Sequence, residues 1–503
     1  MTEATTEPSA SKAPPAPRAA ASTTPAKRKR ADLTFVLDRD LLDRWSAIEP
    51  DWLTADRRAA AERFDALPTE TNRLYTPYID LRTTDLAETR AWESPAIGPE
   101  GGAAAADTAP PDGGATPDAG PMAVIELRED RVSVLTLDPT SVAAGVTVET
   151  LGALVSRDPE TARRLLTDEL AIPADDRLAQ LTRAGWNQGV AIRVPDGVTL
   201  DRPIVVRWLV GNPDRALLTR TIVVLGEGAR ATLVEELRPS GPDIACAAGE
   251  RVPQSLFTGS MELHLGTDSD LAIASIQELG GRAVVFQHRM ASVGEGANLH
   301  WAMAQLGGKL VRSRIDNRLV GDRSTVEQVE IVFAAEDQLI DLTSYTRHVG
   351  RDTTGSLLSK GVLFDKARSY MKGLISIEKT AIGTDSFLGE FGMNLSRAAR
   401  AVAIPSLEID QPDCRRAMHS SSVGPIDETQ LFYLESRGIP PDEARKFIVL
   451  GFLEPVVARV PLEESQDRLR RLLEDKWAAG LARSASLGES AAPASAPGSF
   501  PAT

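Results

Sequence analysis

The chain is poor in the residues that build disulfide frameworks, cysteine metal centres and nucleic-acid interfaces. Among its 503 residues there are only two cysteines, Cys246 and Cys414, which lie far apart and without a CxxC spacing. A disulfide framework and a self-sufficient cysteine site for a metal are therefore excluded. The 56 basic residues are outnumbered by 71 acidic ones, and the net charge of −15 argues against nucleic acid as a main partner.

Long apolar runs are also missing. No stretch supplies the ~20 consecutive apolar residues of a membrane span, and the first 26 residues lack the apolar centre of a secretory signal. We therefore expect a cytoplasmic protein with no membrane partner. The basic tetrad KRKR at 27–30 closes a tail rich in Ala, Pro, Thr and Ser, and a solvated tail is favoured over a contact with an acidic partner or nucleic acid.

Changes in composition divide the chain into segments. The insertion before residue 122 is dominated by Gly, Ala, Pro and Asp, and it has too few large apolar side chains to offset the entropy of ordering. We expect a disordered tail (1–30), an N-terminal helical region (31–94), a disordered insertion (95–121), a mixed α/β connector (122–189), a β-helix core (190–424), a C-terminal helical domain (425–482) and a second disordered tail (483–503).

Helix signals mark both helical regions. Thr54 is placed to cap a helix that runs to Leu67, directly before a proline. In the C-terminal domain, Asp427 is the expected N-cap of the first helix and Gly438 its C-terminal stop. Two further helices follow, and we expect this helical domain to close the end of the β core.

The β core repeats itself. Short alternating or β-branched runs are separated by polar turns that begin with glycine, and the last five of these turns are 28, 27, 29 and 33 residues apart. A period near 30 with strands in each repeat favours a solenoid over an antiparallel sandwich, which does not require a recurring glycine turn. The predicted fold class is mainly β, a parallel β-helix flanked by helical domains. The leading glycines are Gly226, Gly266, Gly294, Gly321, Gly350 and Gly383.

Few residues offer chemistry by themselves. Of the five histidines, His264 and His300 stand in alternating strand contexts that favour a structural role. No P-loop, HExxH, Gly-x-Ser-x-Gly or Gly-x-Gly-x-x-Gly motif occurs in a supporting context, and LGEGARA is better explained as a solenoid turn. We therefore assign no catalytic residue.

Five sequence blocks follow one another in the segment 343–455: RH-x5-TGSLLSKGVLFDKARSYMKG, NLSRAARAVAIPSLEI, MHSSSVG, QLFYLESRGIP and EARKFIVLGF. In this order they resemble the core of the SufB and SufD proteins of the SUF iron–sulfur cluster assembly system, with weaker similarity upstream to residue 190. The N-terminal AAAERFDALP and YTPYIDL look like the SufD pattern. Many SufB proteins, and some SufD proteins, carry a cysteine two residues before the histidine of MHSSSVG, where this chain has Ala417, so the resemblance favours SufD.

The resemblance implies a scaffold and not an enzyme. A SufD-like subunit pairs with a SufB-like paralogue through the β-helices, and it binds SufC, an ABC-type ATPase, through its C-terminal helical domain. A homodimer of the isolated chain is the other assembly to consider. The resemblance implies no stably bound cofactor on the isolated chain and a transient iron–sulfur cluster in the complex, and it leaves flavin binding open.

The same resemblance suggests site residues. His419 is the preferred iron or cluster-interface ligand, with a satisfied polar residue at the cap of the β-helix as the alternative. Cys414 and His348 are weaker candidates. His348 can also be interpreted as a turn residue that is hydrogen-bonded to the backbone. Glu408 either orients a ligand or faces solvent, and solvent is favoured. The candidate partner-binding surface consists of Phe432, Tyr433, Phe447 and Phe452.

Three alternatives remain open at this point. The first is the SufB-like paralogue, which would carry the cluster scaffold site itself. The second is a β-helix carbohydrate-active enzyme, which needs paired carboxylates on one face of neighbouring coils. The third is a purely structural or adhesive solenoid, for which ATPase-binding helices would be superfluous.

Overall fold

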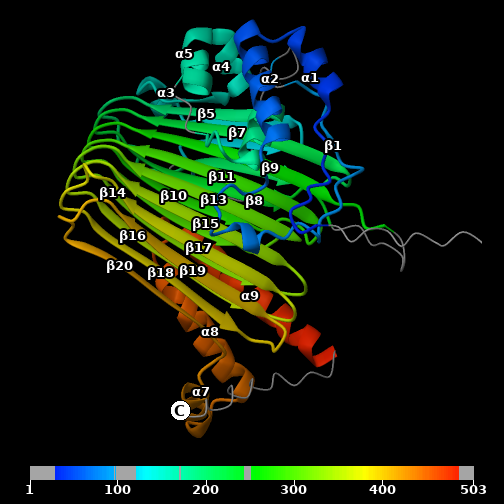
Figure 1. The fold of residues 1–503 in the computed structure, drawn as a ribbon, viewed down its shortest axis with the longest axis vertical. Helices are drawn as coiled ribbons and strands as arrows, with labels where there is room; N and C mark the ends of the chain where they lie inside the picture. The colour runs from blue at the N-terminus through cyan, green and yellow to red at the C-terminus, as the bar shows by residue number, and fades with distance from the viewer. Residues whose placement is uncertain (1–28, 96, 98–119, 169–171, 243–250, 487–503) are drawn as a thin grey trace, which may run out of the picture.

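Two parallel β-sheets wind into a β-solenoid of about eight turns, with helices at its N-terminal and C-terminal sides (Figure 1). The computed structural model describes residues 29–95, 97, 120–168, 172–242 and 251–486. Successive strands alternate between the two sheets, so that each turn of about 30 residues contributes one strand to each. The predicted fold class, a mainly β chain with a parallel β-helix core and flanking helices, is confirmed.

Sheet A contains the odd-numbered strands of the solenoid, paired in parallel and in register from β5 to β19. The short β4 joins its far end in antiparallel fashion and β1 (Arg90–Ala91) pairs with β7. The strands are β4 (Thr147–Thr150), β5 (Gln188–Val194), β7 (Arg215–Leu225), β9 (Ser255–Leu265), β11 (Ala283–Val293), β13 (Leu310–Leu319), β15 (Leu339–His348), β17 (Arg368–Ile377) and β19 (Arg400–Ile409).

Sheet B contains the even-numbered strands from β6 to β20, and β2 and β3 extend its N-terminal end as a hairpin. The strands are β2 (Ala123–Arg128), β3 (Arg131–Leu137), β6 (Ile204–Val210), β8 (Arg230–Pro239), β10 (Asp270–Gln277), β12 (Asn298–Gln305), β14 (Thr325–Ala334), β16 (Thr354–Leu363), β18 (Asp385–Asn394) and β20 (Arg416–Gly424).

Alternation along each strand explains where the core lies. On β14, Val326 and Val332 point into the interior between the sheets and join the main apolar cluster. The intervening Val329, Ile331 and Phe333 point outward and pack against the C-terminal helices. Because successive side chains of a strand face opposite sides, the second half of β14, VEIVFA, is buried on both faces and is apolar except for Glu330.

The glycine turns stack along one edge of the solenoid. A Cβ atom on Gly321 or Gly350 would collide with backbone atoms of the preceding turn, which explains why glycine recurs there. The assignment of Gly383 to the leading glycines of these turns was wrong. Gly383 lies over Asp352, which is two positions after the leading Gly350. The backbone at Gly383 has φ +77°, a left-handed conformation that favours glycine.

The N-terminal helices gather around the first turns of the solenoid, and the segment 67–89, here called the strap, then runs across the outer face of sheet A (Figure 1). Thr54 does not cap the second helix, because the N-cap is Pro50, four residues earlier; the end of the helix before Leu67 agrees with the prediction. The helices are α1 (Arg39–Ser46), α2 (Asp51–Ala66), α3 (Pro139–Ala143), α4 (Leu151–Arg157), α5 (Pro159–Arg163) and α6 (Arg177–Gly185).

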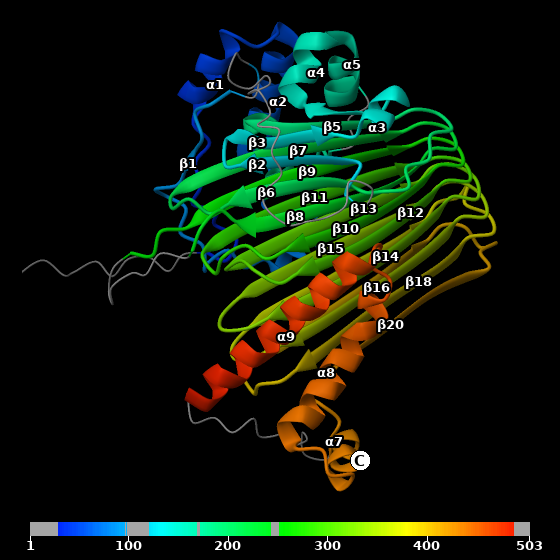
Figure 2. The same cartoon turned by 180° about the vertical axis from the view of Figure 1, so that it is seen from behind.

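The C-terminal helices α7 (Glu428–Ser436), α8 (Pro441–Val457) and α9 (Glu463–Ser486) lie beside the solenoid, and α8 and α9 cross the outer face of sheet B (Figure 2). Asp427 caps α7 and Gly438 follows it with φ +87°, as predicted. The expectation that these helices close the end of the β core was wrong. They are drawn to sheet B by its outward apolar residues, which include Val329 and Phe333.

Several sequence predictions fall on other parts of the chain. Most of the tail 1–30 and of the insertion 95–121 lies outside the described residues, as does the tail from residue 487 onward. Helix α9 continues to Ser486, past the expected boundary at 482. None of the helices in the described part of the chain has the length and apolar character needed to traverse a bilayer.

Candidate functional site

The last turn of the solenoid presents two strands that each pair on one side only. β19 bonds to β17 and β20 bonds to β18, and no described strand continues either sheet. Nearly all of β20 is exposed, including Met418 at 49% and Val423 at 38%. Between Ala417 and Gly424 this strand has neither charge nor proline, the two features that usually protect an edge strand from pairing with another chain.

His419 lies in the middle of β20, exposed to solvent. It is in register with Leu388 of β18, which is fully buried inside the solenoid. Since paired positions of a parallel sheet point to the same side, His419 faces the interior direction at the open end. The structure therefore places its imidazole on the surface that a further turn, or another chain, would cover.

Cys414 lies in the connection between β19 and β20, half buried. With Ala417 it packs at the border of an apolar cluster that includes Ile377 and Leu388. Within the described residues, no three His, Cys, Asp or Glu side chains gather closely enough to hold a metal ion. The other cysteine, Cys246, lies outside the described residues.

His348 ends β15 in the solenoid interior, fully buried. Its Nδ1 lies 2.8 Å from the Thr353 hydroxyl and its Nε2 lies 3.0 Å from the Ser386 hydroxyl. Burial lowers the pKa of His348 to about 4, so the ring is neutral at physiological pH. Both ring nitrogens are therefore engaged, and their partners are side-chain hydroxyls and not the backbone.

Two buried carboxyl groups inside the last turns were missed by sequence reasoning. Glu390 of β18 accepts a hydrogen bond from the backbone N–H of Ile404 at 2.9 Å, and burial raises its pKa to about 8. Two turns deeper, burial also raises the pKa of Glu330, whose carboxyl accepts from Gln328 at 3.2 Å. The alternation of β18, which puts Glu390 on the same face as buried Leu388, was the available signal.

Glu390 gives the open end a possible proton source. It is in register with Ser421 of β20, two residues from His419 along the same strand and on the same face. A carboxyl group with a pKa of about 8 is protonated at neutral pH, so it can donate a hydrogen bond or a proton. The open end thus combines an exposed imidazole with a neutral acid just behind it.

Of the remaining candidates, Glu408 belongs to the last turn but points to its outer face, and the other histidines lie in earlier turns. Glu408 is exposed on the outer face of β19, as the solvent-facing interpretation expected, and it borders a large cavity. Among the other histidines, His300 forms an ion pair with Glu327 at 3.4 Å on the outer face of sheet B. His288 is buried with its Nε2 3.2 Å from a carboxylate oxygen of Asp176.

The four candidate partner-binding residues on α7 and α8 differ in their exposure to solvent. Phe432, Tyr433 and Phe447, which lie on the consecutive helices α7 and α8, are exposed at 71%, 57% and 60%. Phe452 instead packs at the edge of the helix–sheet B cluster, and the Lys360 Nζ lies 4.6 Å from the centre of its ring. The first three residues, here called the aromatic patch, therefore form the exposed part.

The fold and its open end define a class of protein: a β-solenoid that presents unpaired strands and an exposed aromatic patch for association. Residues 209–452 match the family model described as SUF system FeS cluster assembly, SufBD core domain. This match covers just under half of the chain; it supports a SufB/SufD family member and does not distinguish the two branches.

Curated relatives agree with this assignment. Proteins named iron–sulfur cluster assembly SufBD family protein from Staphylococcus haemolyticus, Staphylococcus epidermidis and Staphylococcus aureus are each 27% identical to this chain over 301 residues. The alignment covers 60% of this chain and 62% of each relative. The chain therefore spans about three fifths of the length of the relatives it matches.

Proposed function

We propose that this chain is the SufD-like subunit of a SUF complex, a non-catalytic scaffold in iron–sulfur cluster assembly. It pairs with a SufB-like paralogue and binds a SufC-type ATPase. The nascent cluster is cargo of the complex and not a resident cofactor of this chain. The observation that carries the proposal is the open end of the solenoid, where His419 lies on uncovered β20 beside an uncharged strand edge.

Pairing through the open end follows from the backbone. The unpaired N–H and C=O groups of β19 and β20 can continue their hydrogen-bond ladders into the last turn of a second solenoid. The same contact would cover the exposed Ile409 and Val423, which point in the interior direction. His419 would then lie at the seam between the two chains, where a thiolate of the partner could complete a ligand set.

The SufD-like branch is favoured over the SufB-like one by Ala417. This residue is on the same face of β20 as His419, at the position where many SufB proteins have cysteine, and its methyl group cannot ligate a metal. The SufB-like alternative requires a thiol from this chain at the open end. Cys414 is the nearest thiol in sequence, and it packs against apolar side chains instead.

The role of His419 is tested by cluster content. His419→Ala should leave the free energy of unfolding within ~1 kcal/mol of wild type, because an exposed polar side chain seldom contributes more. The reconstituted complex should still assemble yet contain less iron and sulfide. His300→Ala, which removes a half-exposed histidine far from the open end, is the matched control. Equal cluster content in the His419 variant and wild type would reject the ligand role.

The proposed ATPase contact is tested on the aromatic patch. Replacing Phe432, Tyr433 and Phe447 together by alanine should abolish co-purification with a SufC-type ATPase while the circular dichroism spectrum is kept, since these side chains are exposed. Val142→Ala, an exposed apolar residue near the other end of the solenoid, is the control. Unchanged affinity of the triple variant would reject this surface.

A scaffold should also lack turnover. The isolated chain is expected neither to hydrolyse ATP nor to release sulfide from cysteine, because no P-loop motif is present in its sequence. Steady-state ATPase and desulfurase assays on the purified chain check this expectation. ATPase activity that persists through a further purification step and co-elutes with the chain would contradict the scaffold role.

A further inference from the structure

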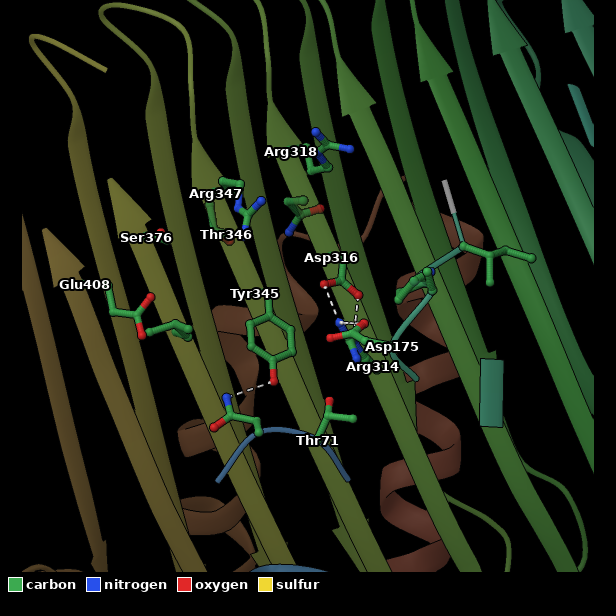
Figure 3. A pocket seen from close by; sticks show the side chains of 16 residues that line it. Thr71, Asp175, Arg314, Asp316, Arg318, Tyr345, Thr346, Arg347, Ser376 and Glu408 are labelled. Atoms are coloured by element: carbon green, nitrogen blue, oxygen red, sulfur yellow. Dashed lines mark hydrogen bonds and ion pairs between the residues drawn. The ribbon is translucent and has the colours of Figure 1, made fainter. Parts of the chain in front are cut away.

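A cavity of about 700 Å³ lies on the outer face of sheet A (Figure 3). Its floor is formed by the parallel strands β13, β15, β17 and β19, and its walls by strap residues 71–72 and by the segment 172–175. This volume is within the range of pockets that bind small molecules. Nothing in the scaffold role proposed above uses it.

The walls are held in place by the strap. The Asn72 side-chain amide donates to the Tyr345 hydroxyl at 3.2 Å. Beside it, Glu70 accepts from Arg312 at 2.5 Å, and both of these side chains are buried. A cavity whose walls are fixed before a ligand arrives binds at a lower entropic cost.

One arginine of the cavity is already neutralised. Arg314 lies 2.8 Å from Asp316 and 3.0 Å from Asp176, and its guanidinium stacks 4.7 Å from the centre of the Tyr345 ring. These contacts use its hydrogen-bonding capacity within the chain. Arg314 therefore shapes the cavity and is not available for a ligand anion.

Two other arginines are available. Arg318 forms no ion pair with any side chain in the described part of the protein. Arg347 has only a 3.4 Å contact with Glu378, and both of these side chains are largely exposed. Figure 3 shows Arg318 and Arg347 on the same side of the cavity.

The two arginines are direct cross-strand neighbours. Arg318 of β13 and Arg347 of β15 are in register and point to the outer face, so their backbones are about 4.8 Å apart. Like charges in this arrangement repel each other, which destabilises the free protein. An anionic group between the two guanidinium forks would remove this repulsion, and carboxylate and phosphate match their geometry.

The opposite side of the cavity is acidic. Along the same outer row, Arg347 is followed by Ser376 on β17 and by Glu408 on β19. Within the described residues, the Glu408 carboxylate forms no ion pair. The cavity therefore has a cationic side and an acceptor side two strands apart, and its volume exceeds that of a single inorganic anion.

We propose that this cavity binds a small organic anion, with its carboxylate or phosphate group between Arg318 and Arg347 and a hydrogen-bond donor of its other end near Glu408. The Tyr345 hydroxyl, which accepts from Asn72, keeps its own proton to donate to the ligand. The site lies on the outer face of sheet A, whereas His419 faces the interior direction of the last turn, and the proposal does not depend on the scaffold role.

The test is calorimetric titration of the full chain at low salt with four probes. Adenosine 5′-monophosphate and gluconate carry an anionic group at one end and donor groups elsewhere, whereas inorganic phosphate and adenosine each carry one of these features. Either of the first two should bind at least tenfold more tightly than inorganic phosphate and adenosine. Which of the two binds more tightly distinguishes a phosphate-bearing from a carboxylate-bearing ligand. An affinity no better than that of inorganic phosphate for both would overturn the proposal.

Matched variants locate the binding site. Arg318→Gln and Arg347→Gln should each weaken binding at least tenfold, while Arg323→Gln should not change it, because Arg323 is exposed in the next turn and already paired with Glu295 at 2.7 Å. Without ligand, Arg318→Gln should raise or preserve the melting temperature, since it relieves repulsion. If both arginine variants bound the ligand as tightly as wild type, or if Arg323→Gln weakened binding as much as they do, the anion would bind elsewhere and the site would be rejected.

Discussion

Glu390 should make the stability of this protein fall as the pH rises. The carboxyl group is buried inside the last turns of the solenoid, and burial raises its pKa to about 8 from the usual 4.5 of a glutamate side chain. Between these two values the folded chain holds a proton at Glu390 that the unfolded chain releases. The folded state is therefore favoured at low pH, and this contribution is lost as the pH rises toward 8.

The magnitude follows from the size of the shift. Each pH unit inside this window changes the free energy of unfolding by about 1.4 kcal/mol per proton. Between pH 5.5 and pH 7.5, wild type should lose about 2 to 3 kcal/mol from this group alone. Glu390→Gln keeps the shape and a hydrogen-bond acceptor for the Ile404 N–H but cannot ionise, so it should not lose this amount.

The assay is urea unfolding at the two pH values, followed by circular dichroism. For each protein we take the change in free energy of unfolding between the two pH values. The value for Glu390→Gln is subtracted from that for wild type, because the contributions of other titrating groups cancel in this difference. Glu227→Gln, an exposed position in the turn between β7 and β8, is the control and should behave as wild type. A difference below about 0.5 kcal/mol between wild type and Glu390→Gln would refute the reasoning.

Two further substitutions test the packing. His348→Ala should cost about 3 kcal/mol in urea unfolding at pH 7.5, because it opens a cavity and leaves the Thr353 and Ser386 hydroxyls without their partner; a loss under about 1 kcal/mol would show that the interior repacks. Trp477→Ala should cost about 3 to 5 kcal/mol and expose α9 to limited proteolysis, because the indole packs 5.5 Å from the ring centre of Phe364. Unchanged protease resistance would mean that other contacts hold α9.

The local features of the chain were predictable from its sequence. Strands and turns follow from short-range alternation and from glycines that allow close stacking, so the solenoid and its period near 30 could be derived before the structure was known. Helix caps such as Asp427 and stops such as Gly438 depend on bonds within a few residues, and both are where they were expected. The SufBD blocks of the sequence likewise identified the family.

Predictions from local patterns were wrong where two nearby positions could each fill the same structural role. Gly383 was placed with the leading glycines because it also precedes a polar turn, yet only its stacking over Asp352 reveals the shifted position. Thr54 is a good capping residue, but the preceding Pro50 already sets an extended backbone at the helix start. In both cases the residue type was compatible with the prediction and the neighbouring chain decided otherwise.

Only the tertiary structure decided what surrounds the open end and the cavity. The apolar run of β14 indicates burial on both faces, but it does not say that Phe333 is covered by the C-terminal helices, which leaves β20 and His419 uncovered. Arg318 and Arg347 are far apart in sequence and become neighbours through the register of the coils. Such contacts arise from long-range packing, in which the free energy depends on all turns together, and residue patterns within one turn do not encode them.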